Sequence, residues 1–94
     1  MRVIKSFRHA GLEKLFKDGS KAGITPTHAS RLIDRMAILN RATGPSGMNI
    51  PGWELHPLRG DLVCHWAVIV SGNWRLTFRF EEQDAILVDY QDYH

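Results

Sequence analysis

The seven residues from Trp74 to Phe80 alternate strictly between apolar and polar side chains. Successive side chains of a β-strand point to opposite faces of its sheet, so this alternation predicts a strand with one buried face. The apolar face comprises Trp74, Leu76, Phe78 and Phe80, and the opposite face carries Arg75, Thr77 and Arg79. Such a strand needs a second layer to cover its apolar side, and the rest of the chain must supply it.

The segments around this strand predict its neighbours in a sheet. Apolar and β-branched runs at residues 65–70 and 85–90 read as strands, and residues 53–56 and 2–7 read as two more. Ser71-Gly72-Asn73 is typical of a tight hairpin turn, and residues 81–84 form the next turn. The order of these strands along the chain favours a mostly antiparallel sheet.

Two helices are predicted between the first strand and the others. In residues 9–18, Leu12, Leu15 and Phe16 recur at helical spacing, and Gly19 is a plausible stop. Thr25 and Pro26 have the residue types preferred at the cap and the first position of a second helix. Its predicted apolar face consists of Ala29, Leu32, Ile33, Met36 and Ala37, with Arg31, Arg35 and Arg41 off that face.

These elements predict an α+β fold in a single small domain over residues 1–94. Residues 43–52 are dense in Gly and Pro and form a loop that separates the helices from the later strands. The predicted order is β-α-α-β-β-β-β, with a helical hairpin packed on one face of the sheet. Trp53, Trp66 and Trp74 are expected in the core or in hairpin packing, and His9 and His28 at the surface.

The charge of the chain is distributed unevenly. All twelve Lys and Arg residues lie in residues 1–80 with only five acids, a formal charge of +7 for that segment, and the other five acids lie in residues 81–94. A basic body attracts polyanions and speeds their association, which modestly favours a nucleic-acid partner. Scattered basic residues that keep helix faces soluble are the alternative interpretation.

Several classes of protein are disfavoured by composition. Cys64 is the only cysteine, so no internal disulfide forms and no thiol-rich metal site is expected. No apolar run approaches the ~18 residues of a membrane span, and the N-terminus lacks the apolar core of a signal peptide. We expect a cytoplasmic protein without a metal or other cofactor.

The chain ends on a titratable cluster. An apolar run leads into Asp89-Tyr90-Gln91-Asp92-Tyr93-His94, so carboxylates, phenols and an imidazole follow a predicted strand. Imidazole changes charge near neutral pH and is suited to proton transfer. A polar tail that caps the last strand is the alternative interpretation.

Several motifs in order resemble the HigB toxins of the RelE/ParE superfamily. They are Leu55-His56-Pro57-Leu58-Arg59-Gly60-Asp61, Asn73-Trp74-Arg75-Leu76-Thr77-Phe78 and the terminal segment 89–94, together with Ile4-Lys5-Ser6-Phe7 and Gly11-Leu12 near the start. The resemblance spans essentially the whole chain. It implies a toxin of a type II toxin–antitoxin system that acts as a ribosome-dependent mRNA endonuclease and needs no metal.

The resemblance also implies a reaction and a set of residues. The ribose 2′-OH would attack the adjacent phosphate, with general acid–base catalysis and stabilisation of the charge at phosphorus. The implied catalytic residues are His56, Arg75, Asp92, Tyr93 and His94. Arg59 stands where relatives often carry Lys and could bind phosphate but not act as a base. Arg79, Lys14 and Lys17 are further candidates for RNA contacts.

Two other functions remain open at this stage. The ParE branch of the superfamily poisons DNA gyrase without cutting RNA, although such a poison has no need of the five implied catalytic residues. An attenuated toxin that mainly binds its antitoxin is the other, and the Arg59 departure leaves room for it. The implied partners are a HigA-like helix-turn-helix antitoxin and the 70S ribosome with mRNA, with DNA reached only through the antitoxin complex.

Overall fold

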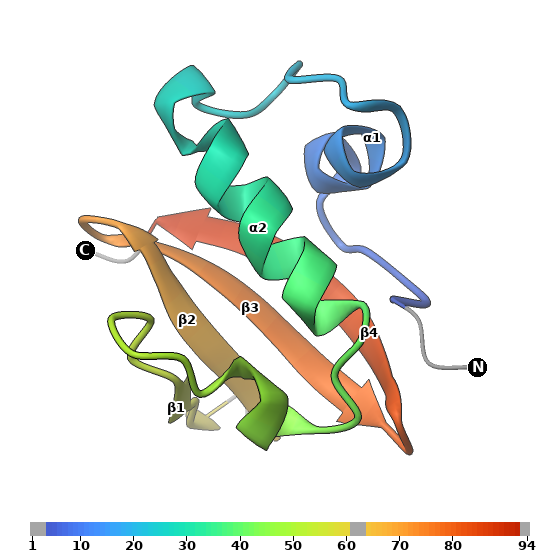
Figure 1. Cartoon of the computed structure of the whole chain (residues 1–94), viewed down its shortest axis with the longest axis vertical. Coiled ribbons are helices and arrows are strands. Elements are labelled where there is room, and N and C mark those ends of the chain that lie inside the picture. Colours follow the sequence, from blue (N-terminus) through green and yellow to red (C-terminus); the bar gives the residue numbers. More distant parts are fainter. Residues whose placement is uncertain (1–3, 61–63, 93–94) are drawn as a thin grey trace.

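The computed structural model describes residues 4–60 and 64–92, which form a sheet covered on one face by helices (Figure 1). The helices are α1 (Ala10–Asp18) and α2 (Ala29–Leu39), and the strands are β1 (His56–Pro57), β2 (His65–Ser71), β3 (Trp74–Glu81) and β4 (Asp84–Asp92). Short 3-10 helices span Pro26–His28 and Pro45–Met48. The sheet is antiparallel in the order β1-β2-β3-β4, which confirms the predicted α+β class.

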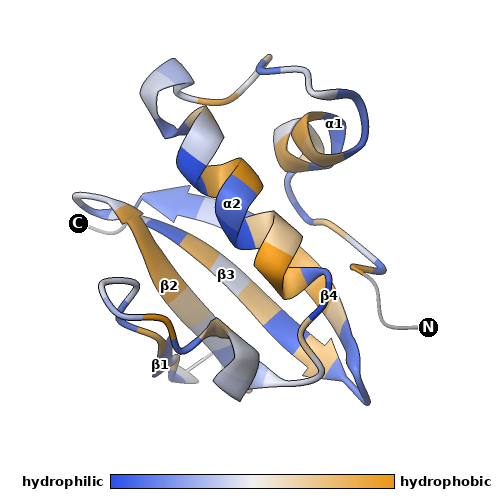
Figure 2. Ribbon diagram, in the orientation of Figure 1, coloured by the Kyte–Doolittle hydropathy of each residue, from blue (hydrophilic) through white to orange (hydrophobic). Residues whose placement is uncertain are grey.

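The structure confirms that the apolar face predicted for β3 is buried at Leu76 and Phe78. Leu76 and Phe78 are 0% exposed and pack with Val68 of β2 against the helices. Leu32 and Met36 of α2 complete this layer of the core. In Figure 2, hydrophobic colouring runs along most of β2. Burial of these apolar side chains therefore fixes which face of the sheet the helices cover.

Helix α1 has the predicted extent and ends. Leu12 and Leu15 are buried, and Gly19 adopts the left-handed conformation (φ 75°) in which its N–H donates to Leu15 O at 3.0 Å. At the other end, His9 Nδ1 accepts a hydrogen bond from the Leu12 N–H at 3.2 Å. His9 is therefore a half-buried N-cap, and its assignment to the surface was wrong.

The buried face of α2 differs from the predicted one. Ile33 is 44% exposed and Ala37 is exposed, whereas Arg35 is only 8% exposed. Arg35 Nε donates to Ile69 O at 2.8 Å, and the guanidinium lies 4.6 Å from the centre of the Trp53 ring. Desolvation, and then the nearby Arg31, lower the pKa of Arg35. These contacts offset the free-energy cost of burying the charged guanidinium. Helix α2 therefore turns Arg35, rather than Ile33, toward β2.

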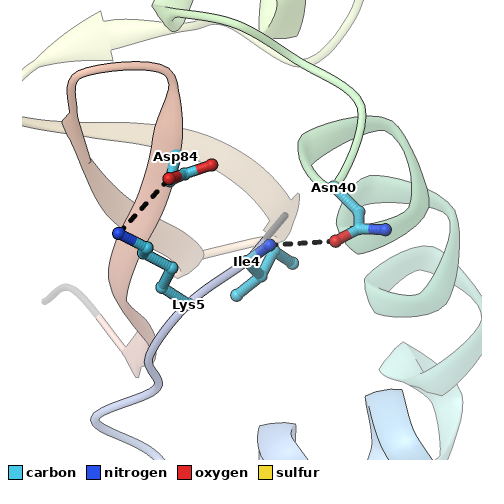
Figure 3. A network of polar contacts seen from close by, with 4 residues as sticks. All are labelled: Ile4, Lys5, Asn40 and Asp84. Atoms are coloured by element: carbon cyan, nitrogen blue, oxygen red, sulfur yellow. Dashed lines mark hydrogen bonds and ion pairs between the residues drawn. The ribbon is translucent and has the colours of Figure 1, made fainter. Parts of the chain in front are cut away.

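The N-terminal segment runs beside β4 but forms no continuous strand in the described residues. Ile4 and Phe7 make isolated parallel bridges to β4. Ile4 N donates to Asn40 Oδ1 at 2.9 Å, and Lys5 Nζ lies 3.4 Å from Asp84 Oδ2 (Figure 3). The predicted first strand is therefore a tether that joins the end of α2 to the edge of the sheet.

The predicted strand over residues 53–56 is also interrupted. The Ile69 N–H donates to Trp53 O at 2.8 Å, so the segment does approach β2. Glu54 then adopts a positive φ of 50°, and regular pairing begins only at β1. A left-handed residue breaks the strand geometry, which explains why the paired part is so short.

A β-bulge shifts the pairing of β3 with β4 by one residue. Thr77 pairs with Asp89, whereas Arg79 pairs with Ile86, so β4 contains one extra residue. Leu87 lies in this stretch with a positive φ of 54°. A one-residue shift exchanges the two faces of a strand, so the bulge decides which side chains at the end of β4 lie on the face opposite the helices.

Candidate functional site

The sheet face opposite the helices brings together residues from all four strands. In cross-strand register, His56 pairs with Ala67, Ala67 with Thr77, and Thr77 with Asp89. The next row on the same face contains Ile69, Arg75 and Gln91. Residues paired directly across strands share a face, so this face carries an imidazole, a guanidinium and an amide.

His56 is held in one tautomer. The half-buried ring directs Nδ1 to Glu54 O at 2.8 Å. A carbonyl oxygen only accepts hydrogen bonds, so Nδ1 must carry the proton. In the neutral ring, the lone pair is then on Nε2, which can take a proton from a substrate, and the protonated ring can return one.

Arg75 supplies a cation in the same row as Gln91. Its Nη1 donates to Gly72 O at 2.7 Å and to Trp74 O at 3.1 Å, which anchors the side chain to the β2–β3 turn. Strand spacing and rise place the Cα atoms of His56 and Arg75 about 12 Å apart. Both side chains are long enough to reach a group between them, so the pair suits an anion that undergoes proton transfer.

A buried aromatic cluster lies behind Arg75 on the helix side. The Trp74 and Tyr90 rings stack with centroids 4.4 Å apart, and the Tyr90 hydroxyl hydrogen-bonds His28 Nδ1. His28 is 7% exposed, so its assignment to the surface was wrong. The cluster fixes the ends of β3 and β4, from which Arg75 and Gln91 project to the opposite face.

The terminal candidates are only partly described. Asp92 is exposed at the end of β4 and pairs with Trp74. By strand alternation it lies on the side of Tyr90, opposite Arg75. Tyr93 and His94 lie outside the described residues.

The four basic candidates fall in different places. Arg79 is exposed on the face of Arg75, four residues farther along β3, or about 13 Å by strand rise. Arg59 is exposed in the segment after β1, three residues beyond His56. Lys14 and Lys17 are exposed on α1, in the helical layer. An ion pair with Glu13 at 2.8 Å raises the pKa of Lys17.

Sequence reasoning missed a polar network on this face. Gln91 Nε2 donates to Asp89 Oδ2 at 2.9 Å and to Thr77 Oγ1 at 3.4 Å, and Asp89 Oδ1 accepts the Tyr90 N–H at 2.9 Å. The alternation of β3 had placed Thr77 on this face, but not its partners. The bulge at Leu87, which has no local signal in the sequence, was needed to place the other two.

Within residues 4–60 and 64–92, no group of three or more His, Cys, Asp or Glu side chains is arranged to hold a metal ion. No helix in the same ranges combines the length and hydrophobicity of a membrane span.

Known proteins match this chain in sequence and, separately, in fold. Residues 5–94 match the model described as a RelE-like toxin of the type II toxin–antitoxin system HigB. The chain is 40% identical over 92 residues to the endoribonuclease HigB of Proteus vulgaris, covering 98% of this chain and all of that protein. A crystal structure of YafQ from E. coli strain BL21(DE3) superposes with a TM-score of 0.58 at 15% identity, over 98% of this chain and 93% of that one.

Proposed function

The chain belongs to the HigB-like family of RelE-like toxins of type II toxin–antitoxin systems, and we propose that it is a ribosome-dependent endoribonuclease that cuts mRNA codons in the A site. The 40% identity to an endoribonuclease over the full length supports this activity. The observation that carries the proposal is the shared sheet face of His56 and Arg75, where a proton-transfer group and a cation stand within reach of one phosphate.

The proposed reaction follows from these two groups. The ribose 2′-oxygen attacks the adjacent phosphorus, the bond to the 5′-oxygen breaks, and the products are a 2′,3′-cyclic phosphate and a 5′-hydroxyl. One group removes the 2′-OH proton and another protonates the leaving oxygen. We propose His56 Nε2 for either step, and the hydrogen bond from Nδ1 to Glu54 O supports this role because it leaves the lone pair of the neutral ring on Nε2. Arg75 stabilises the charge on the phosphoryl oxygens, and no step requires a metal.

We propose that the end of the chain contributes to the site. Asp92, Tyr93 and His94 match the terminal motif of the HigB resemblance, and His94 is the candidate partner of His56 in acid–base catalysis. Tyr93 would stack on a base or donate its phenolic proton. Asp92 lies on the face opposite Arg75, so it would reach the site only around the end of β4, where it would orient an imidazole.

The basic residues divide into two proposed roles. Arg79 lies on the face of Arg75 and Arg59 lies close in sequence to His56, so both are proposed to bind phosphates flanking the cut. Lys14 and Lys17 lie on α1 in the other layer, so they would contact ribosomal RNA rather than the cleaved codon. Contacts of this kind make association dependent on salt.

Membership of the family implies an antitoxin partner. We propose that this partner is a HigA-like helix-turn-helix protein and that the toxin reaches operator DNA only through it. A toxin that acts on ribosomes would work in the cytoplasm. The proposed toxin domain covers residues 1–94.

Primer extension on a defined mRNA in a purified translation mixture, with and without 70S ribosomes, tests the activity. We expect in-frame cuts that require the ribosome. Arg75→Ala, His56→Ala and His94→Ala should each lower the cleavage rate about 10²-fold, because each removes proton transfer or charge stabilisation. Arg41→Ala is the matched control, since Arg41 is exposed in the helical layer.

Two results would contradict the proposal. One is a folded, antitoxin-free protein that makes no cuts but arrests growth with DNA damage, as a gyrase poison would. The other is cleavage at the wild-type rate by the three site variants. That result would show that these residues are not catalytic, although the ribonuclease activity itself would stand.

A further inference from the structure

We propose that Gln91 contacts the RNA substrate directly and that its amide oxygen accepts a hydrogen bond from a neutral donor of the nucleotide beside the phosphate bound by Arg75. The proposal rests on the proposed endoribonuclease function and adds a substrate-positioning residue to its site. Four features of the Gln91 side chain carry it: a defined amide orientation, an unused acceptor, its place opposite Arg75, and the charge beside it.

The orientation of the amide follows from its partners. One end of the Gln91 amide lies 2.9 Å from Asp89 Oδ2. An ionised carboxylate only accepts hydrogen bonds, so this end must be the NH₂ group. The same nitrogen lies 3.4 Å from Thr77 Oγ1, and Thr77 is 1% exposed. Gln91 is therefore anchored by its nitrogen to the sheet before any substrate binds.

The amide oxygen at the other end is unused. Among the described residues, Gln91 Oε1 accepts no hydrogen bond, whereas both partners of Nε2 lie within the protein. The side chain is half-buried, so part of its surface remains open to a ligand. An oriented acceptor loses little side-chain entropy on binding, which is the usual advantage of a preorganised polar group.

The position of Gln91 places this acceptor beside the proposed phosphate site. Gln91 pairs directly with Arg75 across β3 and β4. The Cα atoms of directly paired residues are about 5 Å apart, and their side chains leave the same face. A phosphate bound by Arg75 would therefore bring part of its own nucleotide to Gln91.

The charge beside Gln91 selects the chemistry of the donor. Asp89 holds the amide through its carboxylate, and a second phosphate next to that negative charge would be repelled. A neutral hydroxyl or amino group meets no such penalty. RNA offers neutral donors on the ribose, as 2′-hydroxyls, and on the bases, where we expect the exocyclic amines to be the contacted groups.

The Gln91→Met variant tests the contact, because methionine keeps the length of the side chain and removes the acceptor. Gln83→Met is the matched control, since Gln83 is exposed in the β3–β4 turn. Single-turnover cleavage on programmed ribosomes should show kcat/KM lowered about three- to tenfold for Gln91→Met, the usual effect of losing one neutral hydrogen bond. Gln91→Thr, which suits a strand and is too short to reach, serves if the methionine variant folds poorly.

Modified substrates identify the donor. One set carries a 2′-deoxy sugar at a single nucleotide outside the attacking position, and the other lacks one exocyclic amine. A modification that slows the wild type but not Gln91→Met marks the group that Gln91 binds. Coupling to a 2′-deoxy position supports a ribose contact, and coupling to a missing amine supports a base contact.

The results separate this proposal from the function on which it rests. If Arg75→Ala loses cleavage while Gln91→Met matches Gln83→Met and no modification is coupled to it, the Gln91 contact is overturned and the nuclease stands. If the wild type makes no cuts, the proposed function itself fails.

Discussion

Arg35 makes the strongest prediction about stability, because it joins α2 to β2 and to the segment that leads into β1. Its Nε donates to Ile69 O at 2.8 Å and its Nη1 to Arg31 O at 3.2 Å, while its guanidinium lies 4.6 Å from the centre of the Trp53 ring. The Trp53 carbonyl in turn accepts the Ile69 N–H. Removal of the Arg35 side chain should therefore weaken the packing of residues 53–56, which include His56, against β2.

The size of the effect of Arg35→Ala follows from these contacts. A hydrogen bond from a charged donor contributes about 1.5–3 kcal/mol, and a partly desolvated cation–π contact about 1–2 kcal/mol. Relief of the desolvation of the charge offsets part of the loss. We expect the free energy of unfolding to fall by about 3 kcal/mol, and the melting temperature by about 15 °C at this chain length.

Urea denaturation followed by tryptophan fluorescence measures the change. Arg31→Ala is the matched control, because Arg31 is exposed and donates one hydrogen bond, to Val70 O at 3.1 Å. That variant should lose only about 1 kcal/mol, because water competes for a hydrogen bond made by an exposed charged group. Arg35→Lys should be intermediate, since lysine keeps the charge but not the planar guanidinium.

The pH dependence of the Arg35 effect is also predicted. Burial lowers the pKa of Arg35, yet a guanidinium stays protonated at any pH suitable for these measurements. The difference between wild type and Arg35→Ala should therefore stay constant from about pH 5 to pH 9. A loss below about 1 kcal/mol, or one equal to that of Arg31→Ala, would refute this account of the buried arginine.

Two further changes test the fold. Tyr90→Phe keeps the stack on Trp74 but leaves the buried His28 without its hydroxyl partner, so thermal denaturation should show a loss of about 1–3 kcal/mol; an unchanged melting temperature would contradict a native hydrogen bond. Glu82→Gly should stabilise the protein by about 0.5–1 kcal/mol, because Glu82 is exposed in the β3–β4 turn with a positive φ of 59° that glycine adopts more easily. Gly72→Ala, at φ 54° in the β2–β3 turn, should destabilise the protein for the same reason. Equal effects of the two changes in calorimetry would show that backbone strain is not the cause.

The sequence by itself determined the elements whose causes are local. Strict alternation defines β3 because adjacent side chains of a strand point to opposite faces, and it correctly placed Leu76 and Phe78 in the core. The end of α1 at Gly19 could also be predicted from the sequence, since glycine adopts the left-handed conformation at little cost. The ordered motifs of the HigB resemblance likewise led to the family that the comparisons show.

Tertiary structure decided which long polar side chains are buried. Helical spacing places both Ile33 and Arg35 near the boundary of the apolar stripe of α2. Only the position of the Ile69 carbonyl and the Trp53 ring makes burial of the arginine favourable. His28 is a similar case, because its partner Tyr90 lies 62 residues away along the chain.

The composition of the candidate site depended on tertiary structure in the same way. The sequence named His56 and Arg75 through resemblance, but their shared face follows from the register of β1, β2 and β3. The bulge at Leu87 then sets Asp89 and Gln91 on that face and Asp92 on the other. A strand pattern repeats every two residues, so one inserted residue reverses the assignment of every later side chain, and only the pairing with β3 reveals where it lies.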